Sequence, residues 1–382
     1  MGINRSFEMN FDNTLKIEQI TVYCLQVDIK REFSYGSWPR RFHCVVELSS
    51  QGKYGYGEIC VPETDDTPFV FDEYTAMYQT FSQLTFEEAY RTTVAKRGLF
   101  PNKVLESVEM ALIDLQGKIL GVPAVKLLGL EENNAVSGLY CILQHAPEKV
   151  VEAAEKFMSR YPVTHIKLKL FGELEHDCKL INALRNAVGK DCFIAGDVND
   201  GYPDDLQVLI PAMESLYNAG LDACEDPARM SWQMWNDLQK AVPQLHLIPD
   251  FPMRPAYTTV ETAELCEGMI GNLHPDCMGS IIATAELGKK LKRNNIPVMI
   301  GDDSLVAAGC TAWQQIACAV GAEWVEALEK PDEFAPYADC VISSAMNRQC
   351  DGRYAMTPDV PGFGLVLDRN KLKSLSAFYY SK

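Results

Sequence analysis

The 382-residue sequence lacks any apolar run close to the roughly 18 residues that a membrane-spanning helix requires. It also lacks a basic cluster, and a formal charge of −17 would repel phosphate backbones, which argues against nucleic acid as a partner. None of the 13 cysteines forms a C-x-x-C pair, so we interpret those in apolar runs, such as Cys141, Cys224 and Cys318, as reduced core residues. The polar N-terminus lacks the apolar core of a secretory signal, and we expect a cytoplasmic protein with no membrane partner.

Eight short apolar runs are present from about residue 137 onward, with helical periodicity between them. Their ends lie 24 to 28 residues apart, which suits one strand, one helix and two turns. The pattern predicts an α/β fold with a (β/α)8 barrel, in which active-site residues lie at the C-terminal ends of the strands. An open doubly wound sheet is the alternative, but it would normally carry a Gly-rich phosphate turn after its first strand, and LQHAPEKV has none. The runs are GLYCIL, HIKLKL, CFIAGD, LDACED, LHLIPD, GMIGNLH, IPVMIG and EWVEAL.

The first part of the chain has a different pattern. Two segments alternate apolar and polar residues around the turn signals Gly52 and Gly55, which predicts an antiparallel hairpin or meander, and helical stretches follow. We therefore predict an α+β capping domain over residues 1–135, joined by the tail from about 350 to 382. The barrel then covers residues 136–349.

Three consecutive predicted strands end on a carboxylate: Asp197, Glu225 and Asp250. Neighbouring strand ends converge in a barrel, and three converging carboxylates would repel one another unless a cation neutralised them. Ligation by oxygen alone favours Mg²⁺ over Zn²⁺. The alternative is that each acid caps the next helix or pairs with a lysine or arginine.

The preceding strand, HIKLKL, places Lys167 and Lys169 on one face because strand side chains alternate. Two adjacent ammonium groups are expected to lower each other's pKa, as a lysine acting as a base requires. Lys169, nearer the strand end, is the candidate base, and Lys167 would tune it and contact substrate oxygen. A lysine base beside a divalent cation suggests abstraction of a proton α to a carboxylate, with an ene-diolate intermediate.

Several motifs resemble the enolase superfamily, in its mandelate racemase and muconate lactonizing enzyme branch. They are GKYGYGE, VEMALIDLQGKILGVPAVKLLG, HIKLKL, AGDVNDGY, CEDPA, IPD and TPDVPGFGLVLD. The resemblance implies a modified (β/α)8 (TIM) barrel beneath a capping domain, one Mg²⁺, and Lys169 as the base. It also implies a small-molecule carboxylate substrate and a homo-oligomer. Within AGDVNDGY, Asn199 is a substrate-binding candidate.

The departures from the branch concern the second acid–base group. On the sixth strand, relatives carry a lysine, or an aspartate paired with a histidine of the seventh, whereas this chain has GNLHPDCMGS. One alignment places His274 there, and the other places Asp276 there but needs a two-residue deletion. We favour His274, which can act as acid or base near neutral pH. The seventh strand ends in Asp302 and Asp303, which either contact substrate or cap the next helix.

The loop REFSYGSWPRR corresponds to the mobile capping loop of relatives, and Trp38 would supply an apolar wall to the substrate, with Arg40 and Arg41 as a carboxylate clamp. We therefore predict an isomerase or lyase that racemises, epimerises, cycloisomerises or dehydrates a small acid. The resemblance disfavours a dipeptide, because the eighth strand lacks the Asp-x-Asp that peptide epimerases of this branch use to bind an α-amino group. The alternative is a degenerate barrel that binds metal and a small acid without turnover. A phosphate-binding barrel would need a Gly-rich turn after strand seven or eight, and GDDSLVAAG is too acidic.

Overall fold

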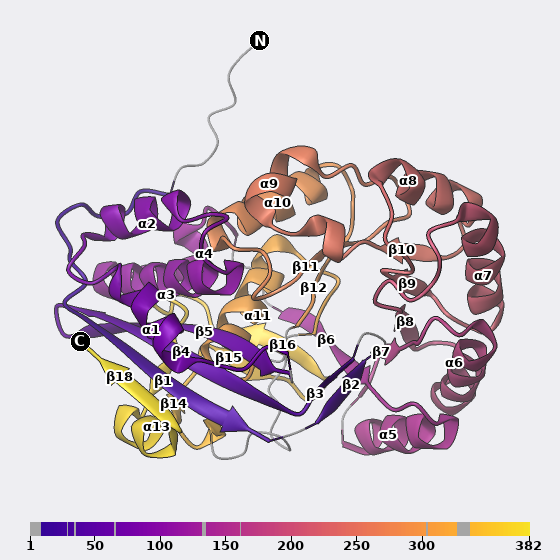
Figure 1. Cartoon of the computed structure of the whole chain (residues 1–382), viewed down its shortest axis with the longest axis horizontal. Coiled ribbons are helices and arrows are strands. Elements are labelled where there is room, and N and C mark those ends of the chain that lie inside the picture. Colours follow the sequence, from indigo (N-terminus) through magenta and orange to yellow (C-terminus); the bar gives the residue numbers. More distant parts are fainter. Residues whose placement is uncertain are drawn as a thin grey trace, which may run out of the picture.

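A computed structural model describes residues 9–28, 30–33, 36–64, 66–131, 135–160, 162–302, 305–326 and 337–382. Its larger part is a barrel of parallel strands beside an antiparallel sheet and helices from the N-terminal part (Figure 1).

The barrel strands coincide with the eight apolar runs of the sequence. Backbone hydrogen bonds join them in the order β10-β9-β8-β7-β6-β13-β12-β11. The ring closes between β10 and β11, where Ile270 N donates to Leu247 O over 3.0 Å and Asn272 N to Pro249 O over 3.3 Å. The predicted barrel is therefore confirmed. Its strands are β6 (Ala135–Ile142), β7 (His165–Lys169), β8 (Phe193–Asp197), β9 (Ala223–Glu225), β10 (His246–Ile248), β11 (Gly271–Leu273), β12 (Val298–Ile300) and β13 (Trp324–Val325).

The connecting helices begin and end where the sequence provides caps. The Asp205 side chain accepts a hydrogen bond from Gln207 N at the start of α7, and the Ser280 side chain accepts one from Ala283 N at the start of α10. Gly189 follows α6, as predicted. The helices are α5 (Pro147–Arg160), α6 (Leu174–Val188), α7 (Leu206–Asn218), α8 (Trp232–Ala241), η1 (Phe251–Met253), α9 (Ala256–Thr262), α10 (Ile281–Arg293) and α11 (Ala308–Val320).

The N-terminal part consists of an antiparallel sheet with helices on one face. Two glycines let α3 lie against β5, because a Cβ at Gly55 would come 2.2 Å from Ala111 O and one at Gly57 2.1 Å from Ser107 O. The elements are β1 (Gln19–Val27), β2 (Arg31–Phe33), β3 (Gly36–Trp38), β4 (Arg40–Ser50), β5 (Lys53–Glu63), α1 (Phe71–Gln79), α2 (Phe86–Ala95), α3 (Asn102–Leu120) and α4 (Ala124–Leu127).

The C-terminal segments return to both parts. β18 pairs antiparallel with β1 in the N-terminal sheet, whereas β16 pairs antiparallel with barrel strand β6. The elements are β14 (Val341–Ser343), β15 (Met346–Arg348), β16 (Arg353–Met356), β17 (Val366–Leu367), α13 (Arg369–Leu375) and β18 (Phe378–Ser381).

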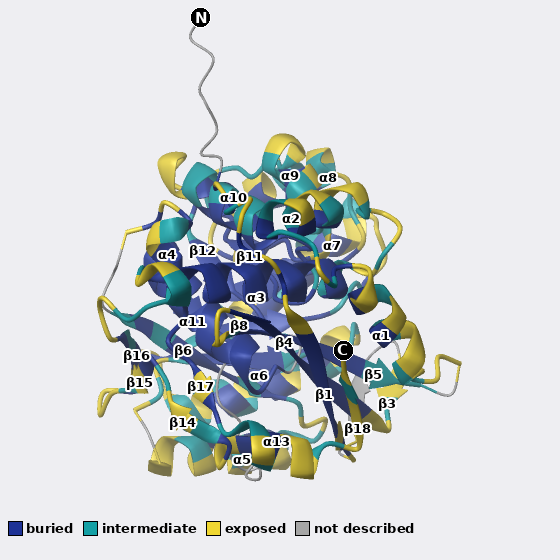
Figure 2. Cartoon of the chain, turned by 90° about the vertical axis from the view of Figure 1, so that its left-hand side faces the viewer, coloured by how far each residue is buried: buried dark blue, intermediate teal, exposed yellow. Residues whose placement is uncertain are grey.

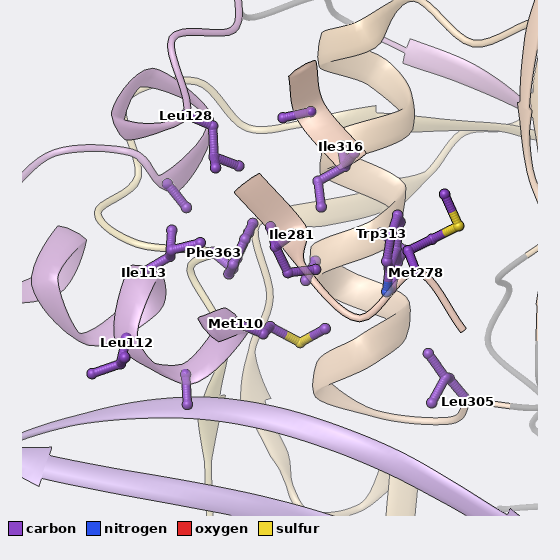
Figure 3. Close-up of a cluster of buried hydrophobic side chains, with 14 of the residues drawn as sticks. Met110, Leu112, Ile113, Leu128, Met278, Ile281, Leu305, Trp313, Ile316 and Phe363 are labelled. Carbon is purple, nitrogen blue, oxygen red and sulfur yellow. The ribbon is translucent and has the colours of Figure 1, made fainter. Parts of the chain in front are cut away.

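One hydrophobic core crosses from the N-terminal part into the barrel. Met110 and Ile113 of α3 belong to the same buried cluster as Trp313 and Ile316 of α11 (Figure 3). α3 is accordingly buried along most of its length (Figure 2). Because burial of apolar surface is the main favourable term in folding, the two parts stabilise each other.

Within the described ranges, no helix combines the length and apolar character needed to cross a membrane. The 13 cysteines are free thiols, and Cys224 and Cys318 are buried as predicted, whereas Cys141 is half-buried.

Candidate active site

Three acidic side chains lie at the ends of three neighbouring parallel strands. Asp197 ends β8 and pairs in register with Glu225, which ends β9. Asp250 lies two residues beyond the end of β10. The three are 2%, 1% and 4% exposed. Lys169 pairs in register with Asp197, so the candidate base ends its strand at the same edge of the barrel.

Lys167 is surrounded by carboxylates. Its ammonium nitrogen lies 2.9 Å from Asp197 Oδ2, 3.0 Å from Glu225 Oε2 and 3.1 Å from Glu326 Oε2. Burial by itself would lower the pKa of Lys167, but the three acids outweigh burial and raise that pKa well above its ordinary value. The expectation that Lys167 and Lys169 lower each other's pKa is therefore wrong for Lys167, because the neighbouring negative charges dominate.

Lys169 contacts two of the other predicted site residues. Its Nζ donates to Asp197 Oδ2 over 2.5 Å and to Asn199 Oδ1 over 2.6 Å. Asn199 has a φ of 49°, in the left-handed region that asparagine tolerates, and its N–H donates to Asp197 Oδ1 over 3.1 Å. Burial would raise the pKa of Asp197, but the ammonium groups of Lys167 and Lys169 lower it overall. These contacts orient the Lys169 ammonium group at the strand ends.

Asp250 is held from two sides. Its backbone N–H donates to Asp226 Oδ1, and the N–H of Phe251 donates to Asp226 Oδ2, each over 3.0 Å. Its side chain accepts two hydrogen bonds from the guanidinium of Arg254, one of them from Nε to Oδ1 over 2.8 Å. The alternative that each strand-end acid pairs with a lysine or arginine thus describes all three acids as they stand, because Lys167 pairs with Asp197 and Glu225, and Arg254 pairs with Asp250.

His274 lies just past the end of β11 and is 7% exposed. Its Nε2 is 4.0 Å from Asp250 Oδ2, and its Nδ1 lies 2.9 Å from Pro275 O. Asn272, on the same face of the strand two residues earlier, donates to Glu225 Oε1 over 3.1 Å. His274 therefore adjoins the acidic side chains at the strand ends.

Asp276 has a different environment. Its Oδ2 accepts a hydrogen bond from Cys60 N of β5 over 2.6 Å. Its own N–H donates to Glu106 Oε1 over 2.8 Å, and Gly279 N donates to Glu106 Oε2 over 3.0 Å. The carboxylate of Asp276 thus joins the loop after β11 to the N-terminal part of the chain.

The loop after β12 is held in a similar way. Glu58 of β5 accepts hydrogen bonds from Val306 N, Ala307 N and Gly309 N at 2.7–3.0 Å. Asp302 accepts one from Leu305 N over 3.0 Å, as in a turn. Asp303 lies outside the described residues.

The predicted carboxylate clamp stays a prediction. Arg40 and Arg41 begin strand β4, and Arg41 is 1% exposed. Arg40 lies 3.2 Å from Glu63 and 3.5 Å from Asp28. Trp38 is half-buried on β3, opposite Arg31, and its role as a substrate wall stays a prediction.

The fit of these residues to Mg²⁺ rests on the chemistry of the donors. Among the residues that the structure describes, no three acidic, histidine or cysteine side chains form a ready metal-binding group. However, burial and then repulsion from Asp197 and Asp250 raise the pKa of Glu225 well above its ordinary value. Glu225 Oε2 also accepts no well-oriented hydrogen bond, although Lys167 Nζ is 3.0 Å away. A dication would relieve this repulsion, so the carboxylates fit Mg²⁺ once Asp250 turns from Arg254.

The sequence reasoning missed three polar residues of this site. Glu326 stands two residues after Trp324 on the eighth strand, and strand alternation could have placed it inside the barrel. The same alternation relates Asn272 to His274. For Arg254 the sequence gives no such signal, because its contact with Asp250 depends on the turn through η1.

The chain was compared with protein families and with curated proteins. The family model described as Enolase C-terminal domain-like matches residues 149–371. Chloromuconate cycloisomerase of Cupriavidus pinatubonensis is 24% identical over 225 residues, which cover 56% of this chain and 60% of that protein. Arabinonate dehydratase of Saccharolobus solfataricus is 24% identical over 338 residues, which cover 84% and 86%. This chain spans about 60% of the length of the first curated relatives that it matches.

Among solved structures, a dipeptide epimerase from Cytophaga hutchinsonii, complexed with Mg and D-Ala-L-Val, superposes with a TM-score of 0.78. It is 20% identical, and the match covers 96% of this chain and 99% of that one. Identity at this level shows the fold alone. The expected homo-oligomer and cytoplasmic location stay predictions.

Proposed function

The chain belongs to the Enolase C-terminal domain-like family, and from this premise we propose that it is an enzyme acting on a small carboxylic acid. The proposed step is abstraction of the proton α to the carboxylate, with Lys169 as the base. Asp197, Glu225 and Asp250 would hold Mg²⁺. The product would arise by racemisation, epimerisation, cycloisomerisation or loss of water.

The observation that carries the proposal is the position of Lys169 relative to His274. In the ring of eight strands, β7 and β11 are four strands apart in either direction, so they lie on opposite sides of the barrel. Lys169 ends β7, and His274 follows β11. Two acid–base groups on opposite walls suit proton removal from one face of a carbon and proton delivery to the other.

The surrounding residues support this division of roles. Asp197 and Asn199 hold the Lys169 nitrogen within 2.6 Å, which fixes its direction. Lys167 would balance the charge of Asp197, Glu225 and Glu326 and lie beside the substrate carboxylate. Asp276 is disfavoured as the second acid–base group, because its Oδ2 already accepts from Cys60 N.

When bound, Mg²⁺ would supply positive charge where the substrate carboxylate gains negative charge. The chain's relatives include a cycloisomerase, a dehydratase and an epimerase, and each of these reactions of an acid can include loss or gain of a proton at the α-carbon. These relatives support the proposed proton transfer at the α-carbon, but they do not identify the product. The proposed substrate class is therefore a small carboxylic acid that carries a proton on its α-carbon.

The test is exchange of the α-proton with solvent. The protein is incubated in D₂O with Mg²⁺ and a panel of hydroxy acids, acyl amino acids and dipeptides, and loss of the α-proton signal is followed by NMR. We expect exchange with at least one acid, and loss of that exchange in Lys169→Ala. Lys179→Ala, which removes an exposed lysine paired with Glu175, is the matched control and should retain exchange. Exchange that survives in Lys169→Ala would contradict the role of Lys169.

The second candidate is a barrel that binds metal and a small acid without turnover. It is favoured by the engagement of both Asp250 oxygens by Arg254. It predicts calorimetric binding of Mg²⁺ and an acid with no proton exchange for any acid in the panel. Exchange at any measurable rate that depends on Lys169 excludes it.

A further inference from the structure

Two nitrogens of the Arg254 guanidinium donate hydrogen bonds to the carboxylate of Asp250. Nε donates to Oδ1 over 2.8 Å and Nη2 donates to Oδ2, an arrangement that engages both carboxylate oxygens. Nη1 lies 3.2 Å from Cys277 Sγ. The short turn η1 between the two residues brings the side chains together. The pair is therefore a specific contact of the folded chain.

The backbone at Asp250 is fixed independently of this pair. Asp226 accepts the N–H groups of Asp250 and Phe251, each over 3.0 Å. Loss of the arginine would therefore leave the carboxylate of Asp250 at the strand ends, free to turn about its side-chain bonds.

A dication adds two positive charges to a place that already holds three cationic side chains. Lys167 and Lys169 are enclosed, with side chains 4% and 12% exposed, whereas Arg254 is 24% exposed. Of these three groups Arg254 has the most access to solvent, and a long arginine side chain can move its charged head towards water. Arg254 is thus the cation best able to leave.

We propose that Arg254 is the resident counter-ion of Asp250 and competes with the metal ion for that carboxylate. In the metal-free protein the guanidinium neutralises Asp250, and metal binding requires its displacement. This inference rests on the proposed function, because it takes Asp250 as a metal ligand. It makes the metal affinity of the site depend on a residue that does not bind the metal.

The test is calorimetric titration of the metal-free 382-residue chain with Mg²⁺, at fixed pH and ionic strength. Arg254→Gln removes the competitor, and we expect its Mg²⁺ dissociation constant to fall about tenfold, the order for one charge-assisted pair. Arg229→Gln is the matched control. It removes the same charge from an exposed arginine that stacks on Phe251 and touches Asp200. This control should change the constant less than about twofold.

Thermal unfolding provides a second readout. Without metal, Arg254→Gln should unfold at a lower temperature than the wild type because Asp250 loses its partner. Saturating Mg²⁺ should raise the midpoint of Arg254→Gln by more than it raises that of the wild type.

The outcomes separate the two proposals. If the wild type binds Mg²⁺ and Asp250→Asn weakens binding, but Arg254→Gln binds no more tightly than the wild type, the competition is refuted and the metal site stands. An equal fall in the Mg²⁺ dissociation constant of Arg229→Gln also refutes the competition, because the loss of one positive charge anywhere near the site would then explain the effect. If neither the wild type nor Arg254→Gln binds Mg²⁺, both the competition and the proposed metal site fail.

Discussion

The backbone N–H of Asp276 donates to Glu106 Oε1 over 2.8 Å, and this bond ties the loop that follows His274 to helix α3 of the N-terminal part. Gly279 N donates to the other oxygen of Glu106 over 3.0 Å. A single buried carboxyl group thus fixes the loop that follows β11.

Replacement of Glu106 by alanine should destabilise the fold. Two buried N–H groups would lose their acceptor, at about 1–3 kcal/mol each. Chemical denaturation monitored by circular dichroism measures the loss. Glu152→Ala, which removes an exposed acid paired with Lys149, is the control and should change the stability by less than about 0.5 kcal/mol. A Glu106→Ala protein as stable as the control would show that these two bonds carry little weight.

The pH dependence of stability should reveal the protonation of Glu106. Burial raises the pKa of Glu106 from 4.5 to about 8 in the folded chain. Between these two values the unfolded chain releases the proton while the folded chain keeps it. The stability due to this group is therefore complete below about pH 4.5 and is lost as the pH rises through about 8.

Glu106→Gln isolates this effect, because glutamine keeps one acceptor oxygen but does not titrate. The neighbouring acid Glu109 is present in both proteins, so its own titration is common to them, apart from its repulsion of Glu106, which also raises the pKa of Glu106. We expect wild-type stability to fall relative to Glu106→Gln from pH 5 to pH 8, as measured by denaturation in one buffer series. A constant difference over that range would contradict the raised pKa.

Lys167→Met should produce a metal-dependent loss of stability. The variant leaves Asp197, Glu225 and Glu326 without their shared ammonium group, and breaking a buried ion pair costs about 3–5 kcal/mol. Thermal unfolding in EDTA should show the full loss, and excess Mg²⁺ should recover part of it. Lys179→Met tests for a general effect of losing a lysine. A loss that Mg²⁺ leaves unchanged would argue against metal binding at these acids.

Substitution of His274 should affect mainly the reaction, whereas substitution of Asp276 should affect mainly the stability of the fold. His274→Asn removes the proposed second acid–base group, so inversion or elimination should slow by about 10²–10⁴-fold, while Lys169-dependent exchange persists. Asp276→Ala removes the acceptor of Cys60 N, so its main effect should be a loss of about 1–3 kcal/mol in stability. NMR of the α-carbon and chemical denaturation measure the two effects. The reverse assignment follows if Asp276→Ala abolishes inversion in a protein of unchanged stability.

The barrel was predictable because it depends on local sequence periodicity. Each strand contains an apolar run, and caps such as Gly189 mark helix ends. The hairpin of β4 and β5 was also predicted, and Gly52, one of its two turn signals, has the positive φ that the turn requires. The other signal, Gly55, was wrong, because it lies within β5. Adjacent ends of parallel strands then bring Asp197 and Glu225 together.

The charge environment of the site was less predictable. The lowered pKa expected for Lys167 was wrong, because Asp197, Glu225 and also Glu326, which lies 159 positions further along the chain, surround its nitrogen and raise its pKa. Arg41, expected in a loop, lies in strand β4 and is buried. In both cases the outcome depends on how segments far apart in the sequence pack together, and local periodicity does not show which segments these are.

By itself the sequence determined the alternation of strands and helices, the family, and the edge at which the acids and lysines lie, because these follow from side-chain direction along each strand. Only the tertiary structure decided their partners. The side chain of Asp250 pairs with Arg254, the carboxylate of Asp276 accepts from Cys60 N, and the backbone N–H of Asp276 donates to Glu106. The physical reason is that a buried charge takes the nearest hydrogen-bond donor or opposite charge, and that choice depends on how distant segments pack.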